Sequence, residues 1–490
     1  MTEGNGEARE LPKGWILVQH KDIAEINPKL PFNDLSDDLL VSFLPMAAVE
    51  EKSSRFSLSE TREYGKVKKG YTQFINGDLI FAKITPCMEN GKVAVVENLK
   101  NGIGFGSTEF HVSRLTSLTS RKYLFYYFVQ EKFRRDARQN MTGSAGQLRV
   151  SKSYFEEIKI PLAPLLEQDR IVERIEELFS DVDKGVESLK TAQKQLKVYR
   201  QAVLKWAFEG KLTEAWRTQH SSILKTGEAL LAEIKAERYS NYQSKYSDPV
   251  LPKDNPFQEL PESWCLVTLD QVSVLVTSGS RGWAKYYSNT GSYFIRAQDI
   301  NTNELNLKNI AYVSLPEGIE GERTRIQTGD ILITITGANV TKTALVTLNL
   351  KKEAYVNQHI GLVRLVETVS RKFIYWWLIS FKHGHAQLMV AAYGAGKPGL
   401  NLTNLKEVFI TLPSLEEQEE IVQEIESRLS TCDQLDASII ENLQKAEALR
   451  QSILKQAFEG KLVPQDPNDE PAEKLLERIQ AERQVNGNTG

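Results

Sequence analysis

The chain has 490 residues, of which 41% are hydrophobic and 26% are charged, and its net charge is −3. This composition is that of a globular protein with two or more domains, and it contains no apolar run long enough to span a membrane. The N-terminus lacks the basic and apolar segments of a secretory signal. Cys87, Cys265 and Cys432 lie far apart, which argues against a disulfide framework or a thiolate zinc site and favours a reducing cytoplasm.

The first predicted element is a mixed α/β block that opens with LPKGW at 11–15. In this block we expect strands around a Gly-Asp turn over 71–86, one amphipathic helix over 121–139 and a glycine-rich loop over 142–151. A long helix without proline is then predicted from Glu167 to Phe208. It runs into AFEGKL, whose glycine suits the left-handed conformation that ends a helix.

All of these elements occur a second time. RQAVLKWAFEGKL at 200–212 matches RQSILKQAFEGKL at 450–462 at 10 of 13 positions, with an offset of 250. At the same offset, EQDRIVERIE at 167–176 matches EQEEIVQEIE at 417–426 at 6 of 10 positions. The opening sequence recurs as LPESW, a second amphipathic helix is predicted over 371–389, and a short amphipathic helix follows each AFEGKL.

Between the opening sequence and the long helix, the two blocks diverge almost completely. One alignable trace is GDLIFAKIT at 77–85 against GDILITITG at 329–337. The opening sequence, the long helix and AFEGKL are therefore repeated, and we call them the frame. The residues between the opening sequence and the long helix differ in the two copies.

Both long helices carry apolar or small residues at heptad spacing in two rows, which predicts a coiled coil. We expect each helix to pair with the other copy. The second helix is more polar in one row, at Arg428, Asn442 and Gln456, and Asn442 is predicted to fix the register at some cost in stability. A simple spacer is an alternative interpretation of this helix pair.

Basic and amide side chains gather around the glycine-rich loops of both blocks. Arginine and lysine can bind guanine edges, asparagine and glutamine can bind adenine edges, and glycine lets the backbone approach phosphates. A single exposed arginine is more often only a solvated surface charge, so each residue is a hypothesis. The candidates for DNA contact are Arg134, Arg135, Ser144, Gln147, Arg149, Lys152, Ser280, Arg281, Lys285, Arg296, Gln298, Lys397 and Asn401.

Catalytic motifs are missing. Pro398 follows Lys397 in GAGKPG, where a Walker A motif needs Ser or Thr. The dipeptides Asn27-Pro28 and Asn255-Pro256 lack the second proline of the tetrapeptide that holds adenine in amino-methyltransferases. The six histidines show no HExxH or paired metal spacing. We therefore predict no catalytic residue, metal site or cofactor in this chain.

The combined pattern resembles the specificity (S) subunit of type I restriction–modification systems. The resemblance rests on LP-x-x-W at the start of each block, on PLAPLLEQDRIVERI and LPSLEEQEEIVQEI at the start of each long helix, and on AFEGKL at its end. It extends from Leu11 to about Arg483, which is nearly the whole chain.

The resemblance implies an α+β fold with two tandem mixed α/β target recognition domains, an antiparallel coiled coil of two long helices and a pseudo-twofold internal repeat. The expected boundaries are 1–163 and 260–413 for the recognition domains, 164–212 and 414–462 for the long helices, 213–259 for a short helix and linker, and 463–490 for the C-terminal helix and tail.

The resemblance also implies a function without catalysis in this chain. Each domain would read one half of a bipartite, asymmetric site in double-stranded DNA, and the coiled coil would set the spacing. Two modification (methyltransferase) subunits would dock on the frame, and restriction (translocase/nuclease) subunits would join them. S-adenosylmethionine, ATP and Mg²⁺ would belong to these partners. Phe208, Lys211, Phe458 and Lys461 are expected to contact the modification subunits.

Two alternatives from other classes remain open. One is a single-chain restriction–methyltransferase enzyme, against which the missing motifs argue. The other is a coiled-coil protein scaffold that does not bind DNA, which would show no salt-dependent affinity for DNA.

Overall fold

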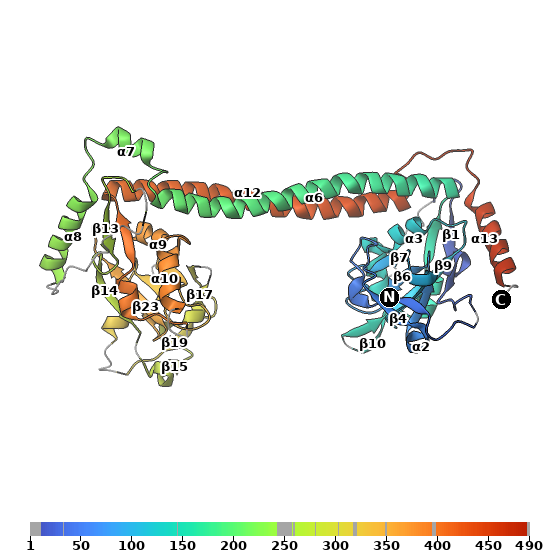
Figure 1. Cartoon of the computed structure of the whole chain (residues 1–490), viewed down its shortest axis with the longest axis horizontal. Helices are drawn as coiled ribbons and strands as arrows, with labels where there is room; N and C mark the ends of the chain where they lie inside the picture. Colours follow the sequence, from blue (N-terminus) through green and yellow to red (C-terminus); the bar gives the residue numbers. More distant parts are fainter. Residues whose placement is uncertain are drawn as a thin grey trace, which may run out of the picture. The chain divides into compact units, whose positions relative to one another are not determined.

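The computed structural model describes residues 11–242 except 33 and 145, residue 257, and residues 260–487 except 280, 302, 317–320, 348–349 and 394–397 (Figure 1). The chain forms two compact units, one of residues 1–189 with 440–490 and the other of residues 190–439. Each unit thus combines one mixed domain with the start of one long helix and the end of the other. Within the described residues, no helix is long and apolar enough to cross a membrane.

Unit 1 builds its domain from two four-stranded sheets. One sheet has the antiparallel order β2-β9-β6-β7, and the other, β4-β3-β8-β5, has a parallel central pair, β3 with β8. A separate antiparallel pair, β1 with β12, joins the two ends of the domain. The strands are β1 (Ile16–Gln19), β2 (Ala24–Ile26), β3 (Leu40–Leu44), β4 (Glu60–Glu63), β5 (Thr72–Ile75), β6 (Leu79–Ala82), β7 (Val93–Val95), β8 (Ile103–Gly106), β9 (Phe110–Leu115), β10 (Thr142–Ser144), β11 (Gln147–Arg149) and β12 (Lys159–Leu162).

Unit 2 repeats this plan. Its antiparallel sheet has the order β14-β23-β20-β21, and its second sheet, β15-β19-β16-β22, contains the parallel pair β16 with β22. The pair β13 with β24 closes the domain as β1 with β12 does in unit 1. The strands are β13 (Cys265–Thr268), β14 (Ser273–Ser278), β15 (Tyr287–Ser288), β16 (Ser292–Ile295), β17 (Ile300–Asn301), β18 (Glu304–Leu305), β19 (Ala311–Val313), β20 (Ile331–Thr334), β21 (Thr343–Leu345), β22 (Ala354–Val356), β23 (Ile360–Leu365) and β24 (Phe409–Leu412).

The helix predicted in each block is two helices, so that prediction is wrong in both copies. The chain leaves the helical conformation at Gln130 and at Ser380, where the backbone is extended. The helices are α1 (His20–Ile23), α2 (Tyr64–Val67), α3 (Arg121–Phe128), α4 (Glu131–Gln139), α5 (Lys152–Glu157), α6 (Leu165–Phe208), α7 (Glu214–His220), α8 (Gly227–Tyr242), α9 (Arg371–Ile379), α10 (Gly384–Tyr393), α11 (Leu402–Lys406), α12 (Leu415–Phe458) and α13 (Ala472–Gly487).

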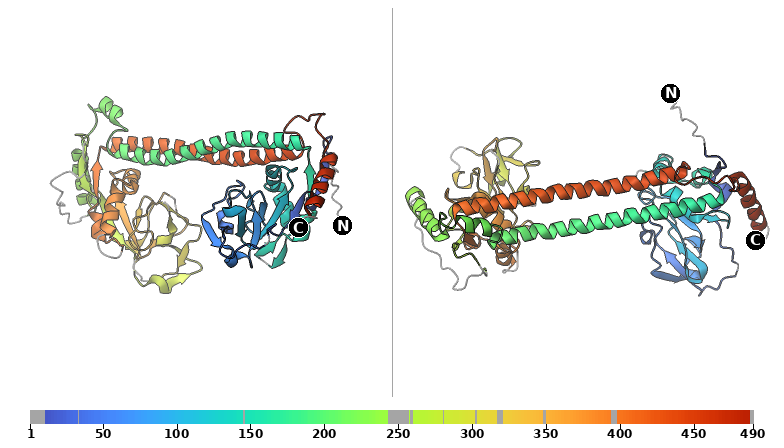
Figure 2. Two further views of the ribbon diagram at one scale, coloured as in Figure 1. Left: turned by 45° about the vertical axis from the view of Figure 1, so that its right-hand side comes forward. Right: turned by 90° about the horizontal axis from the view of Figure 1, so that it is seen from above.

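The long helices α6 and α12 lie side by side, as Figure 2 shows. In unit 2, Gln193 donates to Asp436 at 3.1 Å and Arg200 pairs with Asp433 at 2.7 Å, so residue numbers rise on one helix as they fall on the other. In unit 1, Arg450 of α12 contacts Asp183 and lies over the Phe179 ring of α6. The helices are therefore antiparallel, as predicted.

Only one of the two predicted apolar rows forms a continuous seam. Its residues are buried or half-buried from Ile175 to Val203 in α6 and from Ile425 to Ile453 in α12. In the other row, Leu435 and Leu449 are each 50% exposed, and Asn442 is exposed as well. Asn442 thus lies outside the seam, and the prediction that it fixes the register from within the seam is wrong.

A buried ion pair recurs at the Gly-Asp turn of both domains. Arg114 donates two hydrogen bonds to the buried Asp78 carboxylate, at 2.9 and 2.7 Å. Arg364 does the same to Asp330, at 2.8 Å for both. The glycine before each aspartate has a positive φ and lies against Arg121 or Arg371, so a side chain there would be strained. This explains why the Gly-Asp trace survives while the surrounding block diverges.

The corner where a domain meets its long helix depends on the consecutive Glu and Gln of the helix start. In unit 1, the indole Nε1 of Trp15 donates to the buried carboxylate of Glu167 at 3.0 Å. Gln168 accepts a hydrogen bond from the Ser120 backbone N–H at 3.2 Å and donates one to the Ala163 carbonyl at 2.8 Å. One dipeptide therefore joins the opening sequence, α3 and β12 to the start of α6.

Unit 2 makes the same corner and adds a cation to it. Trp264 donates to Glu417 at 2.9 Å, and Gln418 bridges the Ser370 N–H and the Pro413 carbonyl at 3.0 Å each. The second oxygen of Glu417 accepts hydrogen bonds from Arg217 of α7 at 2.5 Å and from the Thr213 hydroxyl at 2.8 Å.

The equivalent oxygen of Glu167 has no such partner. It is buried without a hydrogen bond among the described residues. Burial raises the pKa of Glu167 above its ordinary value. The folded state therefore binds this proton more tightly than the unfolded chain, and ionisation of Glu167 lowers stability as the pH rises through the folded pKa.

Glutamine substitutions at the two glutamates should have unequal effects. Glu417→Gln should lower the free energy of unfolding of unit 2 by about 3 kcal/mol, because it leaves the Arg217 cation without its counter-charge. Glu167→Gln should lower that of unit 1 by less than about 1 kcal/mol, since an amide still accepts from Trp15. Calorimetric unfolding of the two full-length variants measures both, and equal losses would contradict the assignment of the corners.

Candidate nucleic-acid and subunit interfaces

The first glycine-rich loop forms the hairpin of β10 and β11, which Figure 1 shows at an edge of its domain. Thr85 holds this hairpin to the end of β6: its N–H donates to the Leu148 carbonyl at 3.0 Å, and its hydroxyl accepts from the Leu148 N–H at 3.2 Å. The predicted candidates Ser144 and Gln147 are exposed on the hairpin. A rigid base therefore presents two polar side chains to the solvent.

Three further candidates belong to the same unit, and one of them, Arg149, ends β11 of the hairpin. The Arg149 guanidinium donates two hydrogen bonds to Glu109, at 2.9 and 2.8 Å, and this contact lowers the pKa of the Glu109 carboxyl. Lys152 begins α5 and pairs with Glu156 at 3.3 Å. Arg135 is exposed on α4, and its ion pair to Asp136 is long, at 3.8 Å. The hairpin thus carries Arg149 together with the two polar residues above.

Two predicted arginines are held by their own domains. The Arg134 guanidinium donates to the carbonyls of Val129 and Glu89, and burial lowers its pKa. The Arg296 guanidinium binds the Asp299 carboxylate at 3.0 and 2.9 Å and the Asn309 carbonyl at 2.8 Å. Both side chains therefore stabilise loops, because their donors are directed inward.

Asn401 also has a local structural role. Its side chain accepts from the Asn404 N–H at 2.8 Å, while the Asn404 side chain accepts from the Asn401 N–H at 3.0 Å. This reciprocal pair is the N-terminal cap of α11. Ser151 caps α5 at the corresponding place in unit 1.

The remaining candidates belong to unit 2. Arg281, Lys285 and Gln298 are exposed, and the Lys285 ammonium lies 5.0 Å from the centre of the Tyr286 ring. Ser280 and Lys397 lie outside the described residues. Among the described residues, no group of three or more His, Cys, Asp or Glu side chains could hold a metal ion.

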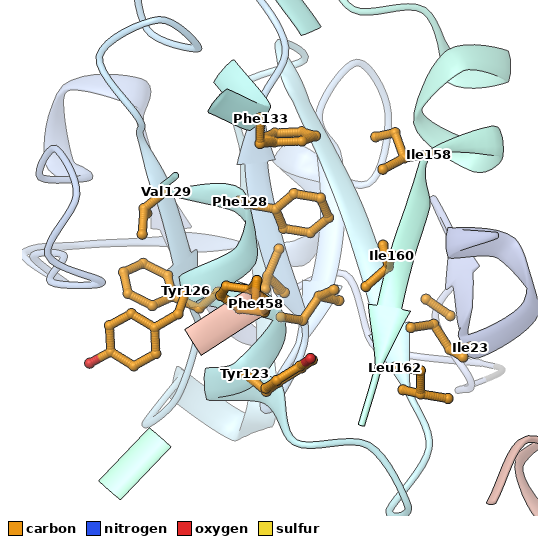
Figure 3. Close-up of a cluster of buried hydrophobic side chains, with 14 of the residues drawn as sticks. Ile23, Tyr123, Tyr126, Phe128, Val129, Phe133, Ile158, Ile160, Leu162 and Phe458 are labelled. Atoms are coloured by element: carbon orange, nitrogen blue, oxygen red, sulfur yellow. The ribbon is translucent and has the colours of Figure 1, made fainter. Parts of the chain in front are cut away.

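The phenylalanines of the two AFEGKL sequences, which we predicted to contact a partner subunit, are buried in their own chain. Phe208 packs against Phe373 and Trp377 of unit 2, with ring centres 5.6 and 5.0 Å apart. Phe458 packs against Tyr123 and Tyr127 of unit 1 at 4.8 and 5.4 Å. Figure 3 shows Phe458 inside the core of that domain. Both rings therefore offer little surface to another subunit.

The rest of each AFEGKL is explained by the same corner. Gly210 and Gly460 have positive φ, and a Cβ at either would lie within 2.5 Å of the proline of the neighbouring opening sequence, Pro261 or Pro12. Lys211 and Lys461 are exposed and pair with Glu209 at 2.8 Å and Glu459 at 2.9 Å. The hexapeptide recurs because each copy closes one domain.

Two residues that sequence reasoning missed lie at the same place in both domains. Glu109 follows β8, and His359 follows β22, at an offset of 250. His359 is exposed, and its ring contacts the Thr336 hydroxyl and the Gln358 amide. The constant offset was the available signal, but neither residue is basic or next to a glycine-rich loop in the sequence.

Comparison with known proteins places the chain in a family. The family model for the type I restriction modification DNA specificity domain matches residues 12–197 and again residues 261–445. The EcoAI type I restriction enzyme specificity subunit of Escherichia coli is 30% identical over 482 residues, covering 87% of this chain and 79% of that protein. The EcoEI specificity subunit of Escherichia coli is 27% identical over 485 residues, with the same coverage.

Two solved structures share the fold at 20% sequence identity. One comes from work on complex assembly and conformational transition of the type I R-M system, with a TM-score of 0.66 over 92% of this chain and 99% of that chain. The other is the HsdS subunit from Thermoanaerobacter tengcongensis, with a TM-score of 0.58 over 94% and 100%. Since the family model covers both domains and the EcoAI relative aligns along most of the chain, this protein belongs to the specificity subunits of type I restriction–modification systems, the non-catalytic components of these complexes.

Proposed function

We propose that each of the two domains reads one half of a bipartite site in double-stranded DNA, and that the length of the α6–α12 pair sets the gap between the halves. The observation that carries this proposal is that the two units share their buried polar contacts but differ in their exposed loops. The Trp–Glu, Gln–Ser and Asp–Arg contacts occur in both units with the same residue types. The exposed loops differ between the units, as two different half-sites require.

The repetition of the frame suits a partner subunit of which two copies bind to one chain. Two copies of one subunit can bind a single chain only if the chain offers the same surface twice. Because Phe208 and Phe458 are buried, we infer that the docking surface lies on the exposed face of the long helices. Tyr199 in α6 is 37% exposed, and Leu449, its equivalent in α12, is 50% exposed. Both supply apolar area of the kind that interface centres contain.

The partners in this proposal are two modification subunits, which restriction subunits join. S-adenosylmethionine, ATP and Mg²⁺ would be bound by those subunits. This chain would supply sequence recognition and the scaffold, which fits the membership of its relatives among specificity subunits.

Exchange of one domain tests the recognition part of the proposal. Replacing residues 260–412 by the equivalent block of another specificity subunit should change one half of the methylated sequence in the assembled complex and leave the other half unchanged. Sequencing of methylated DNA measures this, and the reciprocal exchange of residues 11–163 is the matched control. A change in both halves would rule out independent reading by the domains.

Truncation on the helix surface tests the docking part. Tyr199→Ala combined with Leu449→Ala should weaken binding of modification subunits by roughly tenfold or more, because interface aromatic and apolar truncations commonly cost over 1 kcal/mol. The melting temperature of the free chain should stay within a few degrees, since both side chains are half-exposed. Binding measured by titration calorimetry, with Lys194→Ala as the surface control, decides the point. Unchanged binding would place the docking surface elsewhere.

A further inference from the structure

We propose that one tight turn in each domain fixes the base-reading side chain, with Glu109 positioning Arg149 on guanine in unit 1 and His359 positioning Gln358 on adenine in unit 2. The inference rests on the proposed function. It names, for each half-site, one side chain and the type of base that this side chain reads. The turns are residues 107–109, between β8 and β9, and residues 357–359, between β22 and β23.

The two turns have the same backbone geometry. In unit 1, the Phe110 N–H donates to the Ser107 carbonyl at 3.2 Å; in unit 2, the Ile360 N–H donates to the Asn357 carbonyl at 3.1 Å. The first side chain of each turn accepts from the third N–H: Ser107 from Glu109 at 3.2 Å and Asn357 from His359 at 3.0 Å.

A second backbone–backbone hydrogen bond places both turns at the same point of the fold. The carbonyl of Glu109 accepts from the N–H of Lys83, and the carbonyl of His359 accepts from the N–H of Ile335, each at 2.9 Å. Lys83 directly follows β6, and Ile335 directly follows β20. The scaffold around the two turns is therefore equivalent.

The side chains on this common scaffold differ completely. Unit 1 carries Ser-Thr-Glu at 107–109, and unit 2 carries Asn-Gln-His at 357–359. The Trp–Glu, Gln–Ser and Asp–Arg contacts keep their residue types between the units. In the turns, by contrast, Thr108, Gln358 and His359 are exposed and Glu109 is 24% exposed. A fixed backbone with exchanged donors and acceptors is what a position that selects between bases needs.

In unit 1, the reading group is a guanidinium held in one plane. Two parallel hydrogen bonds from Nε and Nη2 fix Arg149 on the Glu109 carboxylate, and Nη1 donates to the Gln147 carbonyl at 3.2 Å. Arg149 remains 39% exposed. Arginine pairs bidentately with the O6 and N7 atoms of guanine, and a guanidinium oriented in advance loses less conformational freedom on binding.

Unit 2 cannot use the same group, because the position equivalent to Arg149 is a glycine. An isolated bridge pairs Ile84 with Arg149 in unit 1, and the corresponding bridge pairs Thr336 with Gly399 in unit 2. There His359 contacts Thr336 through Nδ1, and its Nε2 lies 3.2 Å from the Gln358 amide nitrogen. The ring thus accepts from the Gln358 amide, and the neighbouring carboxamide suits the N6 and N7 atoms of adenine.

The test uses the complete complex with its partner subunits and duplexes in which single base pairs of the wild-type site are changed. Gln358→Ala should reduce discrimination at one adenine of the unit 2 half-site by roughly tenfold. Arg149→Lys should do the same at one guanine of the unit 1 half-site, because lysine cannot bind bidentately. Lys194→Ala, on the exposed surface of α6 and outside both turns, should leave discrimination unchanged.

The positioning role of Glu109 needs a measurement that would not change if Glu109 only stabilised the fold. Glu109→Gln should lower discrimination at the same guanine as Arg149→Lys, with unchanged affinity for non-specific DNA and an unchanged melting temperature. Glu109→Asp, which keeps the carboxylate, should recover part of the discrimination at that guanine.

The outcomes separate this inference from the proposed function. If the wild-type complex shows no bipartite sequence preference, the proposed function fails. If the wild type is specific but the variants change no position, change every position equally, or change positions other than guanine and adenine, only the assignment of these turns is overturned. Because Gln358 is exposed, its variant keeps the test valid even if a Glu109 variant folds poorly.

Discussion

A buried carboxylate at the start of each long helix holds the architecture together. A glutamate that is removed from water must find hydrogen-bond donors, and here the indole of the opening sequence supplies one. The next residue, a glutamine, joins the cap of the domain helix to the last strand. The direction in which each helix leaves its domain is fixed by these contacts, and the pairing of the helices depends on that direction.

The same corner explains why regions that are repeated in both units alternate with regions that differ between them. A buried polar network tolerates little change, since a lost partner leaves a desolvated group without a hydrogen bond. The Trp, Glu, Gln, Asp and Arg of the frame therefore recur in both units. Exposed loop residues carry no such penalty, so Ser-Thr-Glu can stand in one turn and Asn-Gln-His in the other. Family membership and recognition of different DNA sequences are compatible for this reason.

The sequence predicted the repeat, the mixed domains and the pairing of the long helices, because identical motifs at a constant offset and heptad spacing are local signals. The antiparallel direction of the pair was implied only by the family resemblance. The sequence could not predict which side chains the tertiary fold buries and which it leaves exposed. Phe208 and Phe458 recur in the sequence as strongly as an interface residue would, yet both are covered by the aromatic side chains of a domain helix. The breaks at Gln130 and Ser380 interrupt an unbroken amphipathic pattern. The inward roles of Arg134 and Arg296 depend on carbonyl and carboxylate partners that only the tertiary fold brings near.

The composition of the units has a consequence for biosynthesis. Unit 2 is continuous in sequence, whereas unit 1 needs residues 440–490 to complete it. A ribosome adds about 5–20 residues per second, so the N-terminal domain waits for tens of seconds before its closing segment is made. During that time Tyr123 and Tyr127 lack the Phe458 ring that packs against them in the complete chain. Completion of unit 1 therefore depends on a segment that is synthesised after the whole of unit 2.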